Sequence, residues 1–491
     1  MQCGGMTMNV ITVLVDTVRR DFLKCYGNEH VRTPNISRLA SMGTVYDNTY
    51  LGSFPCMPAR RDFFTGKFEF PWRGWGPLED DDVSLPQILK ANHKPSMLIS
   101  DHYHLWERGA GNYHYDFSGF EFIRGQENDM WITDPTIPIS YPSSMEKICA
   151  HMYDVESGND ADGAFERYCR NINNRKTEED YFAARVMRTA INWVERNRTL
   201  KDFFLLIDCF DPHEPFDPPY PYDQLYDSMY KGDKIIWPSY GWADRYTEKE
   251  LRNIRSLYAG ELSFVDKWLG RLLDKIEELN LLQDTAIIFV TDHGHMLGEH
   301  NVIGKPWLGL ADSNLYQELA HIPLVIWDPH HPGNGQRVTD FVQLVDLFPT
   351  ILDFFNINNN YNTHGRSVRI KENQTAPRPD VILWGKFGES INITDGQYTA
   401  FFAPTTSKAV WYSHSSPHRV RVTGRSDGFF EIEMPSIGEL SPALYNIEED
   451  PYQQHNIINE RPDVIPILRN ELQRFLNRIE APNYLYNRYG L

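Results

Sequence analysis

The sequence predicts an α/β fold with a large, mainly parallel β-sheet flanked by helices, followed by a smaller C-terminal subdomain. Short apolar runs rich in β-branched residues recur along the N-terminal part of the chain, as expected of strands buried on both faces of a parallel sheet. Helical patterns separate these runs, and such alternation is typical of α/β domains. With 491 residues, the chain is long enough for one large domain and a smaller one.

The first predicted strand is Asn9–Val15, a continuous apolar run. Similar runs follow at Ser96–Ser100, Phe203–Phe210, Ala286–Thr291 and Ile322–Trp327. The clearest predicted helix is Thr247–Asn280, because its apolar residues keep steps of three and four and so share one helical face. Thr247 and Glu250 have the spacing of a capping box at its start.

The composition changes at Asn356–Asn362, where a polar stretch begins that runs to Asp380. We therefore predict a large α/β domain over residues 1–365, which would carry the active site, and a smaller α+β subdomain over residues 375–491. Short β-like runs in the second part predict a small antiparallel sheet, with strands at Val381–Trp384, Tyr398–Phe402, Ala409–Tyr412 and Phe429–Ile432. An amphipathic helix, Val464–Ile479, closes the chain.

Charge and composition exclude some classes of partner. The formal net charge of −19 disfavours nucleic acid, since a phosphate backbone requires a basic surface. No apolar run approaches the ~20 residues that span a bilayer. The first eight residues are too short and polar for a secretory signal, and the six cysteines lack disulfide or metal spacing. We expect a soluble, cytoplasmic protein, with a trimmed export signal as the alternative.

Acidic residues follow several of the predicted strands. Asp16, Asp101, Asp211 and Asp292 each lie at or just after a strand end. Active sites of parallel sheets form beyond the carboxyl ends of the strands. Because Asp is also a common turn residue, each one alone could be structural. Together they favour an active site at this edge of the sheet.

The strongest local motif is Cys56-Met57-Pro58-Ala59-Arg60, which continues to Thr65-Gly66. Pro58 suits the first position of a helix, where its missing N–H costs nothing. Cys56 would then lie just ahead of a helix N-terminus, which favours an anion, and Arg60 could point to the same place. For the cysteine alone, the simpler interpretation is a small buried hydrophobe.

This motif resembles the signature of the formylglycine-dependent sulfatases, members of the alkaline phosphatase superfamily. In that family a maturation enzyme reads the signature and oxidises the cysteine to formylglycine, so the resemblance implies such an enzyme as a partner. Five residues alone are only suggestive, but other segments resemble family landmarks in family order. These are Val15-Asp16-Thr17, Cys25-Tyr26-Gly27, Thr33-Pro34-Asn35, Leu39-Ala40, Asp211–Phe216, Thr291–Gly294, Leu297–His300, Lys305, Val345–Thr350, Leu444–Asn446 and Asp450-Pro451.

The resemblance also implies a mechanism. A thiol is a poor catalyst of sulfate transfer because the sulfated thiol that it forms has no easy route for release of sulfate. A hydrated aldehyde carries two hydroxyls on one carbon: one attacks sulfur and expels the alcohol, and loss of a proton from the other releases sulfate and restores the aldehyde. A divalent metal would lower the pKa of the attacking hydroxyl.

Residue roles follow from the same resemblance. Asp16, Asp292 and His293 are the implied metal ligands, and residue 56 and the sulfate complete the shell. Arg60 and Lys305 would hold the anionic centre and the nucleophile. His213, which is implied to lie near the substrate, would protonate the leaving oxygen together with Lys305. Alone, Asp292-His293-Gly294 would be interpreted as a strand-end turn, and His213 and Lys305 as surface residues.

The sequence departs from the family pattern near the metal. Thr17 stands where a second aspartate is common, and His293 stands where asparagine is frequent. Ca²⁺ prefers a shell made only of oxygen ligands, and the His293 imidazole replaces one such oxygen with nitrogen. Mn²⁺ is therefore as plausible as Ca²⁺ at this site. This arrangement resembles the phosphonate monoester hydrolase and arylsulfatase branch.

Asp101-His102-Tyr103-His104 replaces the family's Gly-Lys-Trp-His segment. One alignment sets His102 against the lysine as a substrate-binding residue and His104 against the histidine. A shift of one residue sets Asp101 and Tyr103 there instead. We favour the first alignment because it keeps His104 as a base for regeneration of the aldehyde.

We therefore predict a hydrolase of small anionic sulfate esters, aryl or carbohydrate. The alternatives are a phosphonate monoester or phosphodiester hydrolase with the same nucleophile, and a non-catalytic sulfatase-fold binding protein. The sequence does not identify the alcohol part of the substrate, and a homo-oligomer stays open. Four tryptophans in predicted loops could stack on a sugar or an aryl ring, although core packing is the commoner role: Trp72, Trp75, Trp106 and Trp131.

Overall fold

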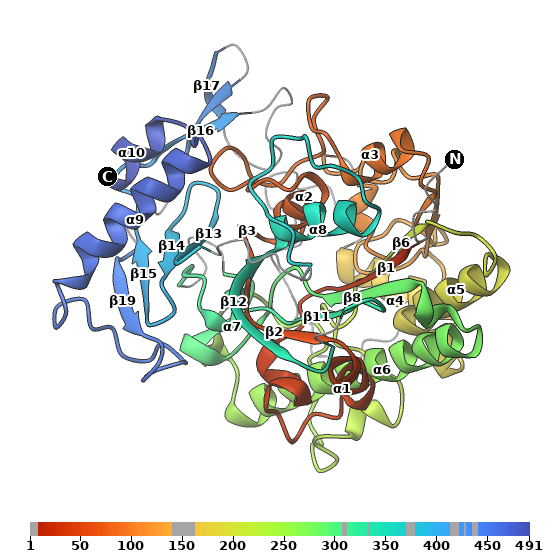
Figure 1. Ribbon diagram of the computed structural model, residues 1–491. Coiled ribbons are helices and arrows are strands. Elements are labelled where there is room, and N and C mark those ends of the chain that lie inside the picture. The colour runs from red at the N-terminus through yellow and green to blue at the C-terminus, as the bar shows by residue number, and fades with distance from the viewer. Residues whose placement is uncertain are drawn as a thin grey trace, which may run out of the picture.

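The computed structural model is built around one eight-stranded sheet, and the predicted α/β fold is confirmed (Figure 1). Its strand order is β12-β2-β11-β8-β1-β6-β4-β5. The strands are β1 (Asn9–Val15), β2 (Thr44–Tyr50), β4 (Ser96–Ser100), β5 (Gly119–Phe122), β6 (Phe204–Cys209), β8 (Thr285–Val290), β11 (Leu324–Trp327) and β12 (Arg337–Gln343). The structure describes residues 8–107, 109–139, 163–306, 312–331, 334–369, 379–412, 422–426, 429–434 and 440–491.

Strand β1 lies inside the sheet and pairs in parallel with β8 on one side and β6 on the other. Of the eight strands, β11 alone runs antiparallel to its neighbours, β8 and β2. The bounds predicted for β1 and β4 are confirmed. Strands β2, β5 and β12 were not predicted. Strand β2 is interrupted by polar residues, β5 has only four residues and none of them is fully buried, and β12 is largely exposed along its first half.

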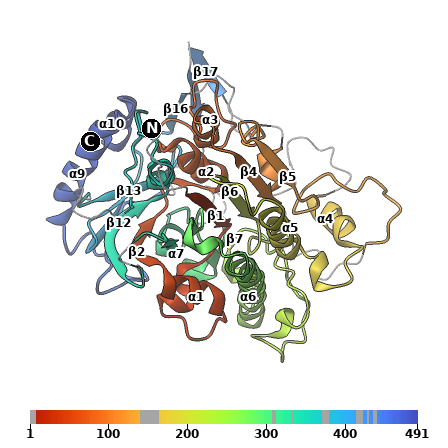
Figure 2. The ribbon, with the colours of Figure 1, turned by 45° about the vertical axis from the view of Figure 1, so that its right-hand side comes forward.

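Helices cover both faces of the sheet, as Figure 2 shows. Alternate side chains of a strand point to opposite faces. Ile11, Val13 and Val15 of β1 therefore belong to a core with helices on one face, whereas Val10 and Leu14 belong to the core on the other. The first layer holds α1 (Pro34–Met42), α5 (Phe182–Arg196) and α6 (Glu248–Glu278), and the second holds α2 (Cys56–Thr65), α3 (Leu85–Ala91) and α8 (Leu347–Phe354).

The predicted long helix is confirmed as α6, which begins after Thr247 with the expected capping box to Glu250. Shorter helices are α4 (Ala164–Ile172), α7 (Gln317–Ala320) and α10 (Tyr484–Tyr489). A small antiparallel sheet of β7 (Gly241–Trp242), β10 (Val302–Gly304) and β9 (Met296–Leu297) ends next to Lys305.

The C-terminal part forms a second sheet of order β19-β15-β14-β13-β3, against which α9 (Val464–Arg478) packs. Its strands β13 (Ile382–Lys386), β14 (Ile391–Thr394), β15 (Tyr398–Phe402) and β19 (Ala443–Asn446) are antiparallel. The fifth strand, β3 (Ser53–Phe54), comes from the segment just before Cys56 and pairs in parallel with β13. A three-stranded sheet joins β16 (Lys408–Tyr412), β18 (Phe429–Glu433) and β17 (Val422–Ser426).

This shared sheet ties the two parts of the chain together directly beside the Cys56 motif. The predicted bounds of the two domains stay a prediction, since much of the linker, residues 370–378, lies outside the described residues. Cys3 and Cys149 also lie outside them, and the four described cysteines are free thiols. Within the described ranges, no helix combines the length and the hydropathy that crossing a membrane requires.

Helix α6 also anchors the loop after β1. The hydroxyl of Tyr258, a fully buried residue, donates to the carbonyl of Thr17 at 2.8 Å and accepts from the N–H of Arg19 at 2.7 Å. Thr17 has φ of +56°, a conformation that a β-branched residue rarely adopts. The two hydrogen bonds therefore hold a strained loop in place.

We expect Tyr258→Phe to lower the free energy of unfolding by about 1–3 kcal/mol, because it leaves a buried N–H and a buried carbonyl without partners. Urea denaturation would measure the change. Tyr486→Phe is the matched control, since its hydroxyl bonds to Asn477 at the surface. An equal loss in the two variants would contradict the anchoring role of Tyr258.

Candidate active site

Four side chains that could bind a metal gather at the carboxyl ends of the central strands. Asp16 follows β1, Asp292 and His293 follow β8, and Cys56 begins α2. Their ligand atoms all lie within 4.8 Å of one another, and all four residues are buried. Because β1 and β8 are adjacent and parallel, their ends bring Asp16 and Asp292 together, as expected for an active site in such a sheet.

Cys56 occupies the first turn of α2. The helix begins at Cys56, two residues before the predicted start at Pro58. Pro58 is tolerated there because the first N–H groups of a helix have no intrahelical partner. The Cys56 Sγ lies 3.0 Å from the Lys305 Nζ and 3.2 Å from the His293 Nε2. Burial, reinforced by Asp16, raises the pKa of the thiol, so a reactive thiolate is disfavoured here.

Asp16 and Asp292 differ in how their oxygens are satisfied. Asp292 Oδ1 accepts from the backbone N–H groups of Thr17 at 3.1 Å and His293 at 2.8 Å. Neither buried oxygen of Asp16 accepts a well-aligned hydrogen bond, and Oδ2 has only the ionic contacts with Arg60 at 3.0 Å and His102 at 3.2 Å. Burial and the Asp292 carboxylate raise the pKa of Asp16. A divalent cation would relieve both penalties, so the residues present fit a metal ion.

The orientation of His293 suits a metal ligand. Its Nδ1 lies 2.6 Å from the Gly294 carbonyl and donates to it, which leaves the lone pair of Nε2 directed toward the cluster. Burial lowers the pKa of His293 to about 4, so the ring is neutral near pH 7. A side chain at position 294 would collide with the Glu318 carbonyl, which explains the glycine after His293.

Arg60 lies beneath the cluster and contacts three carboxylates. Its guanidinium is 2.6 Å from Asp292, 3.0 Å from Asp16 and 2.7 Å from Asp208. Asp208 was missed from the sequence because it lies within the apolar run of β6. A signal was nevertheless present: an acidic residue in a strand buried on both faces is costly unless a cation pairs with it.

Lys305 and His213 form a pair next to Cys56. The Lys305 Nζ is 2.5 Å from the His213 Nε2, and the His213 Nδ1 is 2.7 Å from the Glu214 carbonyl. Burial and Lys305 lower the pKa of His213, so the neutral ring accepts from the ammonium at Nε2. Burial opposes the charge of Lys305, but Cys56 and Glu214 outweigh it and raise the pKa. The pair therefore holds a proton next to the nucleophile position.

His102 and His104 have different surroundings. The His102 Nε2 is 3.2 Å from Asp16 Oδ2, and burial lowers the pKa of this ring. Both nitrogens of His104 meet carboxylates, Glu107 at 2.8 Å and Glu127 at 3.0 Å. These two glutamates outweigh burial and raise the pKa of His104. The two glutamates thus favour the protonated ring of His104, and a role as base requires that one glutamate release it.

Two of the four strand-end aspartates do not join the cluster. Asp101 accepts from the N–H of Phe210 at 2.8 Å. Asp211 accepts from Gln126 at 2.6 Å and from the N–H of Ala183 at 2.9 Å, and burial raises its pKa to about 6. Both stabilise the loop connections beside the site.

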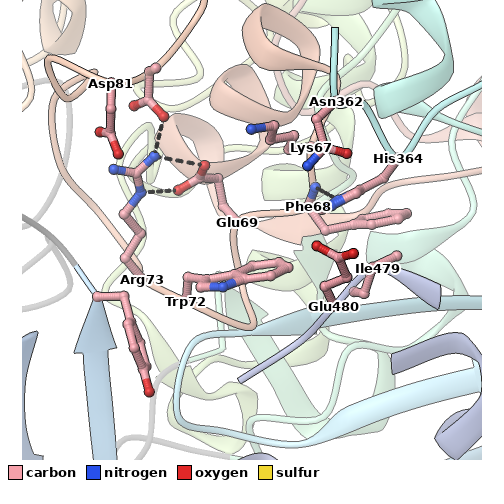
Figure 3. A pocket seen from close by; sticks show the side chains of 12 residues that line it. Lys67, Phe68, Glu69, Trp72, Arg73, Asp81, Asn362, His364, Ile479 and Glu480 are labelled. Atoms are coloured by element: carbon pink, nitrogen blue, oxygen red, sulfur yellow. Dashed lines mark hydrogen bonds and ion pairs between the residues drawn. The ribbon is translucent and has the colours of Figure 1, made fainter. Parts of the chain in front are cut away.

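Trp75 is the candidate tryptophan that contacts a site residue, since its ring meets His104 edge to face at 4.8 Å. Trp72 instead lines a cavity of about 400 Å³ with Phe68 and His364, beyond the C-terminal end of α2 (Figure 3). None of the clustered residues lines that cavity. Trp106 stacks on Phe122 at 4.0 Å, and Trp131 is 39% exposed.

Comparison with known proteins agrees with this geometry. The sulfatase family model matches residues 8–357. An arylsulfatase of Clostridium perfringens is 25% identical over 509 residues, which cover 95% of each chain. The phosphonate monoester hydrolase of Agrobacterium radiobacter has a TM-score of 0.69 at 19% identity and covers 96% of both chains. A structure in complex with its substrate D-glucosamine-2-N,6-O-disulfate has a TM-score of 0.67 at 15% identity and covers 97% of this chain and 99% of its own.

The chain belongs to the sulfatase family. It is an enzyme of the sulfuric ester hydrolase class. The resemblance inferred from the Cys56 motif is thereby confirmed, and so is the alkaline-phosphatase-like fold that the resemblance implied.

We expect Asp16→Asn and Asp292→Asn each to lower metal occupancy and turnover together, because each removes a negative charge from the cluster that could hold a metal. Metal analysis of purified protein would measure occupancy. Asp211→Asn is the matched control, as it removes a buried strand-end carboxylate outside the cluster and should leave occupancy unchanged. His293→Asn should shift the preference toward Ca²⁺, since it replaces an imidazole with an amide oxygen. Active wild-type protein without a bound ion would refute the assignment.

Proposed function

We propose that this enzyme hydrolyses sulfate esters, aryl or carbohydrate, with a formylglycine made from Cys56 as nucleophile. The observation that carries the proposal is the buried cluster of Asp16, Cys56, Asp292 and His293, with the Lys305 ammonium 3.0 Å from the sulfur. The complex of the structurally similar protein with a disulfated glucosamine supports a carbohydrate sulfate as one substrate class.

Asp16, Asp292, His293 and the oxidised residue 56 would hold one divalent metal. Two carboxylates and one imidazole are compatible with Mn²⁺ and with Ca²⁺. When bound, the ion would supply Lewis-acid stabilisation of the sulfate oxygens and lower the pKa of the attacking hydroxyl.

The protein's own side chains would manage the protons. The hydrated residue 56 has two hydroxyls; one gives its proton to water and attacks sulfur, and the bond from sulfur to the alcohol oxygen breaks. The Lys305–His213 pair would supply the proton that the leaving oxygen takes, since the Lys305 ammonium donates to the His213 Nε2 at 2.5 Å and lies next to residue 56. Loss of the second hydroxyl proton then breaks the carbon–oxygen bond to sulfate and restores the aldehyde, which water hydrates again.

Arg60 would stabilise the anionic centre of the site, and Lys305 would hold the nucleophile at residue 56. His102, neutral and beside Asp16, is the proposed substrate-binding residue of the replaced segment. His104 remains the proposed base for regeneration of the aldehyde, and its release from Glu107 or Glu127 would be part of that step. Formylglycine formation requires a maturation enzyme as a partner. The cytoplasmic location and a homo-oligomer stay predictions.

A phosphonate monoester or phosphodiester hydrolase is the second candidate function. Thr17 and His293 favour it, because the site has two carboxylate ligands and an imidazole and therefore carries less negative charge than one with three carboxylates. Sulfate monoesters, phosphonate monoesters and phosphate diesters all carry one negative charge. The non-catalytic alternative conflicts with the complete set of site residues and with membership of the enzyme class.

We expect the mass of the peptide that contains residue 56 to show the thiol replaced by an aldehyde. Cys56→Ala should fold normally, as judged by circular dichroism, and lose turnover because no hydroxyl remains to attack sulfur. Cys169→Ala offers a matched control, since Cys169 is a buried thiol on α4, outside the cluster. Full activity of Cys56→Ala would refute the mechanism.

Substrate choice gives a separate prediction. We expect kcat/KM to be highest for sulfate esters, measurable for phosphonate monoesters and diesters, and lowest for phosphate monoesters, whose second charge gains no dedicated partner. Matched aryl leaving groups on one enzyme preparation would give the comparison. A diester or phosphonate value well above the sulfate value would favour the second candidate, and a preference for phosphate monoesters would refute the charge argument.

A further inference from the structure

Asp208 contacts Arg60 from a strand that contributes nothing else to the metal cluster. Its carboxylate meets the guanidinium side-on: Arg60 Nε donates to Oδ2 at 2.9 Å and Nη2 donates to Oδ1 at 2.7 Å. Both residues are almost completely buried. A two-point contact of this kind fixes the plane of the guanidinium as well as its position.

Because the plane is fixed, the N–H groups of Arg60 that do not bond to Asp208 point toward Asp16 and Asp292. Nε and Nη2 bond to Asp208. Nη1 donates to Asp292 Oδ2 at 2.6 Å, and Nη2 also lies 3.0 Å from Asp16 Oδ2. Asp16 and Asp292 are the two carboxylates proposed to hold the metal. Asp208 therefore sets the contact between Arg60 and the metal ligands without belonging to the ligand set itself.

The charge balance points the same way. Arg60 brings one positive charge into a site with no solvent exposure, where charges interact strongly. If Asp16 and Asp292 were its only partners, Arg60 would cancel half of their negative charge. Asp208 adds a third carboxylate to the partners of Arg60, so Asp16 and Asp292 do not have to balance the guanidinium charge alone.

We infer that Asp208 is a positioning residue that orients Arg60 and offsets its charge, so that Asp16 and Asp292 retain the charge needed to hold a divalent metal. This inference rests on the proposed metal site. It assigns a role to a residue outside the group of potential metal ligands.

The neighbouring arginine provides a matched control. Arg61, next to Arg60 on α2, is also buried, and Glu69 contacts it at 2.5 Å. Glu69 also pairs with Arg73 and lies beside the cavity of Figure 3. Glu69→Gln therefore removes a buried carboxylate from an arginine of the same helix while leaving the metal cluster untouched.

The experiment uses the full chain, stripped of metal and titrated with Mn²⁺ by calorimetry. We expect Asp208→Asn to weaken Mn²⁺ binding by about 10-fold or more, the usual effect of losing a partner behind a ligand, and to lower kcat. Glu69→Gln should bind Mn²⁺ as the wild type does, even if urea denaturation shows a loss of stability. Asp208→Glu keeps the charge but changes the side-on geometry, so its affinity should stay near the wild-type value while kcat falls.

The outcomes separate this inference from the proposed function. A wild type that binds no divalent ion would overturn the metal site and the role of Asp208 with it. If the wild type binds Mn²⁺ and is active, wild-type affinity in Asp208→Asn would overturn only the inference. Equal weakening in Glu69→Gln would also overturn it, as the effect would then come from packing of α2. Should Asp208→Asn not fold, wild-type kcat in Asp208→Glu would overturn the orienting role.

Discussion

The buried ion pairs of Arg60 are the interaction on which the rest of the site depends. A guanidinium without solvent exposure requires carboxylates around it, and carboxylates buried together require a cation between them. Arg60 meets Asp16, Asp208 and Asp292 at 3.0, 2.7 and 2.6 Å, so side chains from three neighbouring strands converge on one residue of α2. This convergence fixes where the helix begins relative to the sheet, and Cys56 stands at that beginning.

Cys56 has neighbours of opposite charge. Asp16 and Asp292 belong to the same cluster of potential metal ligands as Cys56. The Lys305 ammonium lies 3.0 Å from the Cys56 sulfur and donates to the neutral ring of His213. Preorganised charges of this kind can stabilise negative charge that develops in a transition state.

Features remote from the reaction serve this arrangement. Tyr258 of α6 ties down the strained loop that carries Thr17, whose N–H in turn holds Asp292. Strand β3 joins the C-terminal sheet immediately before Cys56, so the approach to the nucleophile is supported from the C-terminal part of the chain. Glu107 and Glu127 clamp His104, which the Trp75 ring also contacts.

The sequence by itself determined the fold class, the buried strands, the long helix α6 and the family, because these depend on local periodicity and on residues close together in the chain. Through the family resemblance it also predicted Asp16, Cys56, Asp292 and His293 as metal-site residues, and the structure brings these four side chains together. The strand ends alone offered four aspartates, and the tertiary structure shows why only two of them lie in the cluster. Asp292 joins Asp16 because β8 and β1 are neighbours, whereas Asp101 and Asp211 bond to backbone and amide groups nearby. The partners of Asp208 and the contact of His104 with Glu127 also emerged only there, since a contact between residues far apart in the chain is set by packing.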